Sequence, residues 1–254
     1  MQRINEHICR LTLPYKDIFT TVYTVETDDG ALLFDTGSFD SDAEEYTLPF
    51  LTEAGISKDR VKYIFISHNH KDHAGGLACL LPHLPNAKIL SRSPKIKEQY
   101  PTRAEFFDDG ATVSHALQLV TLPGHTEDSA ALYDTRTKTL ISGDGLQLYG
   151  IFGSGNWGAN ISFPRMHMTA IKKLRGMDIA QLLTAHDYHP YGHRCRGKEA
   201  VLAALDAAEA PLLHIKELIQ THPDLNDDAI AALYNQRKLP TLGAHVVTAV
   251  RKAL

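Results

Sequence analysis

The sequence has few cysteines, no long apolar run and no strong charge of either sign. Its cysteines are Cys9, Cys79 and Cys195, an odd number of widely spaced thiols that fits neither a disulfide framework nor a Cys-x-x-Cys zinc site. No stretch approaches the roughly 20 consecutive apolar residues of a membrane helix, and the first residues lack the apolar segment of a signal peptide. We therefore expect a cytoplasmic chain with free thiols and no membrane partner.

The balance of charge argues against a nucleic-acid partner. Among 254 residues, 26 lysines and arginines face 30 aspartates and glutamates, which gives a net charge of -4. Without a basic arm or cluster, there is no electrostatic reason to expect binding to a phosphate backbone. We expect a small-molecule substrate instead, and the sequence leaves the oligomeric state open.

Strand-like and helix-like patterns alternate over most of the chain. Strands are predicted at residues 20–26, 31–34, 61–67, 88–90, 117–122, 130–134, 139–142 and 179–185, and helices at 41–53, 77–84 and 166–174. From Lys198 onward the composition turns rich in Ala and Leu, and Val246, Val250 and Leu254 have helical spacing. The fold class is therefore α+β, with one domain over residues 1–197 and a helical C-terminal extension over residues 198–254 packed on it.

The most distinctive feature is a cluster within the fourteen histidines. The segment His68-Asn69-His70-Lys71-Asp72-His73 carries three imidazoles and one carboxylate, and it lies between a predicted strand and Gly75-Gly76. Imidazole nitrogens and carboxylate oxygens are ligands of zinc and similar divalent metals. Structural zinc sites are normally closed by four ligands, mostly cysteine, so this segment favours a catalytic metal.

Three more candidate ligands stand near the ends of later strands. His125 and Asp144 fall in the loops after residues 117–122 and 139–142, and His186 directly follows the strand predicted to end at Ala185. Taken alone, His125 would more often be interpreted as a loop histidine than as a ligand, and Asp144, between Gly143 and Gly145, could be only a turn residue. Their candidacy rests on the series.

The whole series resembles the metallo-β-lactamase-fold hydrolases. The cluster at 68–73 matches the family's His-x-His-x-Asp-His signature, and the other segments stand in the family's order. They are Phe34-Asp35-Thr36-Gly37, Pro123-Gly124-His125-Thr126, Ser142-Gly143-Asp144 and Ala185-His186-Asp187. The match covers roughly residues 18 to 193. The resemblance implies a four-layer αββα sandwich, with two mostly antiparallel sheets faced by helices and the metals at one edge.

The resemblance also implies two metal ions and their ligands. His68, His70 and His125 would bind one ion, Asp72, His73 and His186 the other, and Asp144 would bridge them. Two cations about 3.5 to 4 Å apart share a hydroxide that is nucleophilic at neutral pH. Zinc is the expected metal, while iron and manganese also suit such ligands.

Three aspartates are the catalytic candidates. Asp72 and Asp144 are ligands in the family pattern, and Asp72 has an oxygen left to orient the hydroxide. Asp35 ends an apolar strand, and the resemblance places it behind the metal-binding loop, where it would hold a ligand histidine or the loop backbone. The alternative is that Asp35 only caps a turn.

Candidates for substrate contact lie in the later loops. The stretch after Asp144 mixes glycine with the only tryptophan, so it could form a wall over the metals. The candidate residues in this stretch are Tyr149 and Trp157. Tyr188 and His189, which follow His186, are further candidates, and so is His193. Equally, the aromatic residues could pack the C-terminal helices onto the core, and the two histidines could be surface residues.

We expect a hydrolase that uses a metal-bridging hydroxide on a small-molecule ester, thioester or lactone. The lack of a signal peptide argues against an exported β-lactamase. A phosphodiesterase is the alternative, and it would favour cations beside the metals, for which Lys71, Arg165 and Arg194 are the candidates. A non-catalytic metal-binding or ligand-binding sensor is a third interpretation. Redox di-iron relatives usually place a glutamate where this chain has His70.

Overall fold

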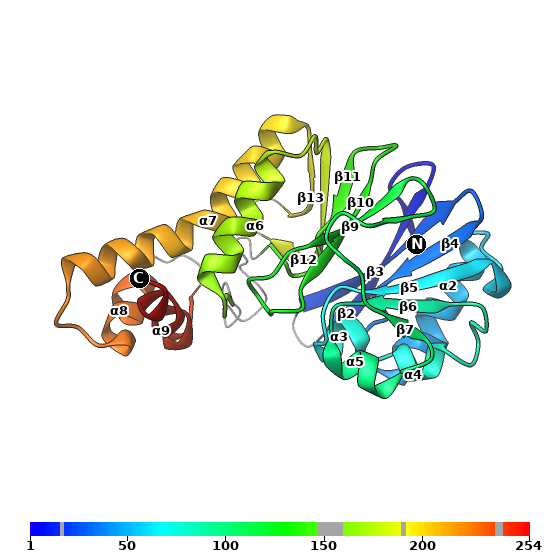
Figure 1. The fold of residues 1–254 in the computed structure, drawn as a ribbon, viewed down its shortest axis with the longest axis horizontal. Coiled ribbons are helices and arrows are strands. Elements are labelled where there is room, and N and C mark those ends of the chain that lie inside the picture. Colours follow the sequence, from blue (N-terminus) through cyan, green and yellow to red (C-terminus); the bar gives the residue numbers. More distant parts are fainter. Residues whose placement is uncertain (16–17, 147–159, 189–191, 237–240) are drawn as a thin grey trace. The chain divides into compact units, whose positions relative to one another are not determined.

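The structure is a computed structural model, and it describes residues 1–15, 18–146, 160–188, 192–236 and 241–254 (Figure 1). The chain divides into two compact units. Unit 1 comprises residues 1–121 and 130–135, and unit 2 comprises residues 122–129 and 136–254. The boundary expected between residues 197 and 198 stays a prediction.

Unit 1 contains a seven-stranded sheet whose strands follow the order of the sequence. Its strands are β1 (Gln2–Arg3), β2 (Ile8–Tyr15), β3 (Ile18–Thr27), β4 (Gly30–Phe34), β5 (Val61–Ile66), β6 (Lys88–Ser91) and β7 (Ala104–Glu105). Pairing is antiparallel from β1 to β4 and parallel from β4 to β7. The expectation of a mostly antiparallel sheet is therefore wrong here. Helical segments follow β4, β5 and β6, and such crossovers return the chain in the same direction.

The helical segments of unit 1 are short and cover this sheet. They are α1 (Asp40–Asp42), a π-helical turn (Ala43–Thr47), α2 (Leu48–Glu53), a 3-10 turn (Lys58–Arg60), α3 (Lys71–Ala74), α4 (Leu77–Leu80) and α5 (Pro94–Gln99). Figure 1 shows α3, α4 and α5 grouped beside β6 and β7. The helix predicted at 41–53 is present with a π-turn in its middle. Its buried Phe50 and Leu51 pack with Leu33, Ile64 and Leu80 in one apolar cluster.

The other strands belong to a second mixed sheet. In unit 1, β8 (Thr112–Val113), β9 (Leu117–Thr121) and β10 (Ala130–Asp134) pair antiparallel. In unit 2, β11 (Thr139–Ile141) pairs parallel with β12 (Gln181–Tyr188), and β12 pairs antiparallel with β13 (Gly192–Arg196). All eight predicted strands are present.

Unit 2 also holds the predicted C-terminal helices. After α6 (Pro164–Arg175) come α7 (Lys198–Thr221), α8 (Asp227–Asn235) and α9 (Ala244–Ala253). Val246 and Val250 are buried in a cluster with side chains of α7 and α8. Leu254, expected on the same face, is 53% exposed because α9 ends before it. None of the described helices has the length and hydropathy of a membrane-spanning helix.

Candidate metal-binding residues

Four of the predicted ligands lie in one loop of unit 1. The loop begins after β5, and His70 is the extended residue that precedes α3, whose first turn carries Asp72 and His73. The Nε2 atom of His68 lies 2.9 Å from Nδ1 of His70, and the rings of His68 and His73 are 4.2 Å apart. Nε2 of His73 lies 3.3 Å from Oδ2 of Asp72. His68, Asp72 and His73 are buried, whereas His70 is exposed.

The two glycines after this loop permit a close backbone approach. A methyl group on Gly75 would overlap the carbonyl oxygen of Ser38, and one on Gly76 would lie 2.5 Å from the carbonyl oxygen of Thr36. Thr36 in turn donates from its backbone nitrogen and from Oγ1 to the carbonyl oxygen of His73, at 2.8 and 2.9 Å. The segment after β4 therefore packs closely against the candidate ligand loop and is hydrogen-bonded to it.

Asp35 joins these two segments. Its backbone has a φ of 60°, which is unusual for a residue other than glycine. The fully buried carboxylate accepts hydrogen bonds from the nitrogen and Oγ of Ser67, both at 2.8 Å, and from Nδ1 of His73 at 2.8 Å. Burial raises the pKa of this carboxyl, while His73 and Ser67 act to lower it. With its proton held on Nδ1, His73 keeps the Nε2 lone pair for a metal.

The other three predicted ligands lie in unit 2, grouped around Asp144. Its Oδ2 lies 3.6 Å from Nε2 of His125, and its Oδ1 lies 3.2 Å from Nε2 of His186. All three side chains are buried. His186 lies inside β12 and not after its end, because β12 continues past an irregularity in its pairing with β13 to Tyr188. A carboxylate with one oxygen toward each of two imidazoles has the donor arrangement of a bridging ligand.

The orientation of His125 depends on a residue that the sequence did not single out. Nδ1 of His125 donates to the backbone carbonyl oxygen of Asn160 at 2.7 Å. This bond fixes the proton on Nδ1 and leaves Nε2 directed at Asp144. Ser67, which holds Asp35, was also not predicted, although its place directly before His68 marks it as a neighbour of the site.

His167, one of the histidines left without a role, is buried on α6 beneath Gly124. A methyl group on Gly124 would lie 2.5 Å from its Nδ1. Nε2 of His167 donates to the carbonyl oxygen of Ala208 on α7 at 3.2 Å. Burial lowers the pKa of His167 to about 4. A neutral imidazole therefore forms part of the packing under the loop that carries His125.

Most predicted substrate contacts cannot be placed on this framework. Tyr149, Trp157 and His189 lie outside the described residues, and so does the side chain of Tyr188. His193 is half-buried on β13.

The three candidate cations have different surroundings. Nε of Arg165 donates to the carbonyl oxygen of Ala253 at 2.6 Å, and Nε of Arg194 donates to Oε1 of Gln181 at 2.8 Å. Lys71 belongs to the ligand loop, with Nζ 4.1 Å from the centre of the Phe39 ring. Only Lys71 of these three is thus adjacent in the chain to predicted ligands.

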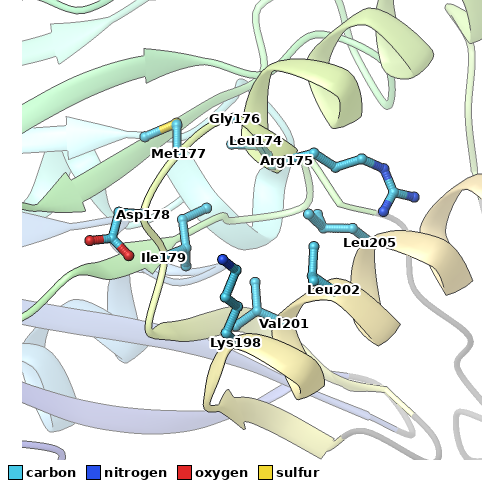
Figure 2. A pocket seen from close by; sticks show the side chains of 10 residues that line it. All are labelled: Leu174, Arg175, Gly176, Met177, Asp178, Ile179, Lys198, Val201, Leu202 and Leu205. Carbon is cyan, nitrogen blue, oxygen red and sulfur yellow. The ribbon is translucent and has the colours of Figure 1, made fainter.

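A pocket of about 260 Å³ in unit 2 is separate from these residues. Figure 2 shows its lining, which comes from the end of α6, the turn that follows and the first turns of α7. Its apolar part is formed by Leu174, Met177, Ile179, Val201, Leu202 and Leu205. No predicted ligand or catalytic residue lines it.

The donor set of the seven candidates fits divalent metal ions. All seven are among the described side chains suited to holding a metal ion. The set contains only imidazole nitrogens and carboxylate oxygens, six of the seven side chains are buried, and two of the imidazoles have their tautomer fixed by a hydrogen bond. Buried groups of this kind are expected to be metal ligands or ion pairs.

Comparison with known proteins gives a family and distant relatives. The family model described as the metallo-beta-lactamase superfamily matches residues 15–194. Thioesterase pkgB of Emericella nidulans is 30% identical over 52% of this chain and 37% of its own length. Hydroxyacylglutathione hydrolase of Aeromonas hydrophila is 28% identical over 44% of this chain and 41% of its own length. This chain spans about half the length, or less, of the first curated relatives it matches.

Solved structures share the fold at low identity. A metallo-beta-lactamase family protein from Thermus thermophilus superposes with a TM-score of 0.70 at 15% identity, over 99% of this chain and 95% of that one. Rubredoxin oxygen:oxidoreductase from Desulfovibrio gigas does so with a TM-score of 0.68 at 16% identity, over 98% of this chain and 74% of that one. At such identities these likenesses show the fold alone.

Proposed function

Because this chain belongs to the metallo-β-lactamase superfamily, we propose that it is a hydrolase with a dinuclear metal centre. His68, His70 and His125 would hold one ion, Asp72, His73 and His186 would hold the other, and Asp144 would be the ligand shared by both. The observation that carries this proposal is the position of Asp144, whose two oxygens face Nε2 of His125 and Nε2 of His186 separately. We propose zinc as the native metal.

The chain's own residues prepare the centre for catalysis. When bound, the two cations supply a nucleophilic hydroxide at neutral pH and stabilise the developing oxyanion. Asp35 keeps the proton of His73 on Nδ1, so that Nε2 is available. Asp72 places Oδ2 beside Nε2 of His73. The other carboxylate oxygen of Asp72 can orient a water molecule and accept a proton from it. Asp35 is thus a positioning residue, whereas Asp72 and Asp144 touch the reacting centre.

We propose thioesters as the first substrate class to test, with esters and lactones next. Two distant relatives carry the names thioesterase and hydroxyacylglutathione hydrolase, which supports this order. A phosphodiester substrate would favour at least two cations beside the metals. Arg165 and Arg194 instead donate to Ala253 and Gln181, which favours a carbonyl substrate over a phosphodiester.

The test combines metal analysis with a substrate panel. Protein purified without added metal is assayed for zinc, iron and manganese, and then for turnover of a thioester, a p-nitrophenyl ester, a lactone and bis-p-nitrophenyl phosphate. We expect two equivalents of metal and thioester turnover. Asp144→Ala should lower kcat/KM on the order of 10²- to 10³-fold, while Glu98→Ala, at an exposed position of α5, should leave it unchanged.

The other outcomes reject specific parts of the proposal. Faster turnover of the phosphodiester would replace the substrate class with the phosphodiesterase alternative. Two equivalents of metal without turnover of any substrate would favour a sensor. Less than one equivalent of metal after reconstitution, again without turnover, would overturn the metal centre itself.

A further inference from the structure

The C-terminal helices of unit 2 are connected to the loop that carries His125. The connection runs through Asn160 and Ile161, two residues that precede α6. The significance of His125 as a metal ligand rests on the function proposed above. The contacts themselves are independent of it.

The first step is a pair of reciprocal hydrogen bonds between two loops. Nδ1 of His125 donates to the carbonyl oxygen of Asn160 at 2.7 Å, and the backbone nitrogen of Phe163 donates to the carbonyl oxygen of Gly124 at 2.8 Å. Two bonds in opposite directions fix both the position of the loop and the tautomer of His125. Any displacement of residues 160–163 would therefore be transmitted to the imidazole.

The second step anchors this segment to the helices. Ile161 is fully buried in the apolar cluster formed with Leu212 of α7, Ile230 of α8 and Val246 of α9. Nε2 of His245, in the first turn of α9, donates to Oδ1 of Asn160 at 2.9 Å. Asn160 thus accepts from His125 with its backbone oxygen and from His245 with its side chain.

We propose that the C-terminal helices position His125, with His245 and Ile161 as the positioning residues. Burial of Ile161 holds the segment in place, and the bond from His245 restrains the Asn160 peptide whose oxygen orients the imidazole. Without these restraints, the segment samples positions in which Nδ1 of His125 loses its acceptor. The proton then moves to Nε2 in part of the population, and this tautomer cannot donate its Nε2 lone pair to a metal.

The test compares four variants with the wild-type chain. His245→Ala removes the donor to Asn160, while His245→Gln keeps an N–H donor at a similar reach. Ile161→Ala instead removes apolar contacts between this segment and the C-terminal helices, and it leaves the hydrogen bond from His245 unchanged. Lys252→Ala changes an exposed residue of α9 and serves as the control. Far-ultraviolet circular dichroism confirms that each variant is folded.

The first readout needs no metal. In the metal-free protein, long-range ¹H–¹⁵N spectra of the imidazoles report the tautomer of His125, which we expect to be Nδ1–H in the wild type. His245→Ala and Ile161→Ala should shift His125 toward a mixture with Nε2–H. His245→Gln and Lys252→Ala should retain the wild-type spectrum. An unchanged His125 signal in both His245→Ala and Ile161→Ala would overturn the proposal.

The second readout is metal affinity, measured by competition with a chelator. Removal of an indirect partner of a ligand should weaken one of the two equivalents about tenfold, and His245→Gln should restore it. If His245→Ala bound both equivalents of metal as tightly as the wild type does, this would also count against the proposal. If the wild-type chain bound no metal, the proposed function would fail, and the tautomer of His125 would still decide the positioning role.

Discussion

Nδ1 of His73 donates a 2.8 Å hydrogen bond to Oδ2 of Asp35, and both side chains are completely buried. The pair joins the end of β4 to the first turn of α3, two segments that are 38 residues apart. A buried carboxylate at such a position stabilises one orientation of the imidazole and one tautomer. The orientation of this imidazole in the candidate ligand loop is therefore fixed by the chain itself.

Replacing Asp35 by asparagine should weaken metal binding. The neutral amide removes the charge that holds the His73 proton on Nδ1, and its NH₂ group can donate to Nδ1 and favour the opposite tautomer. We expect affinity for one equivalent of metal to fall by roughly 10- to 100-fold, measured by chelator competition. Asp224→Asn, at an exposed position, is the control, and equal affinities in the two variants would contradict the role of Asp35.

Gly75→Ala should destabilise the fold through a steric clash and not through backbone strain. Gly75 has an ordinary helical φ of -66°, so the cost comes from the overlap of the new methyl group with the Ser38 carbonyl oxygen. Overpacking of this kind costs about 3 kcal/mol, which urea unfolding would measure. At Gly176 the nearest atom to a methyl group is 3.3 Å away, and alanine there should change stability by about 0.5 kcal/mol or less. Similar losses at both glycines would argue against the close approach.

Acidification should destabilise the fold because of His167. Burial lowers its pKa in the folded chain to about 4 from 6.5, so the unfolded chain takes up a proton at higher pH than the folded one. The contribution to the free energy of unfolding is complete above pH 6.5 and is lost as the pH falls toward 4. The loss amounts to about 3 kcal/mol.

The matched variant is His167→Gln, which retains a donor for Ala208. Urea unfolding of both proteins at several pH values isolates the histidine, because all other titrating groups are shared. The difference between wild type and variant should appear between pH 6.5 and 4. A constant difference over that range would show that burial does not lower the pKa of His167 in the folded chain.

Metal removal should lower the melting temperature. A metal that binds only the folded chain stabilises it by about 2.7 kcal/mol when present at 100 times its Kd. We therefore expect a chelator to lower the Tm of the wild type, while Asp144→Ala should respond less and Glu98→Ala should respond fully. A Tm that is independent of metal in the wild type would contradict the proposed centre.

The longer elements could be predicted from the sequence because their pattern is local. Strand β12 and helix α6 bury one face or both, and their apolar spacing shows it. Strands β1, β7 and β8 have only two residues each, and pairing with a neighbour, which the sequence does not show, defines them. Strand β13 was missed because histidine and two arginines stand among its five residues.

In the candidate site, too, some residues could be predicted from the sequence and others could not. Its proposed ligands have side chains with a distinct chemistry, the imidazole and the carboxylate, so sequence motifs could point to them. Asn160 acts on His125 through a backbone carbonyl oxygen, a group that almost every residue offers, and no sequence pattern marks it. The position of His186 within β12 likewise depends on the pairing of β12 with β13. This pairing reaches Tyr188, beyond the apolar run that ends at Ala185.

The bond from the Phe163 amide to the Gly124 carbonyl oxygen supplies a natural reporter on the unmodified chain. An amide proton exchanges with deuterium from solvent only when its hydrogen bond opens. The exchange rate of this single proton therefore measures how often the loop carrying His125 separates from residues 160–163. Slower exchange after addition of zinc would show that the ion and the two loops stabilise the same closed arrangement.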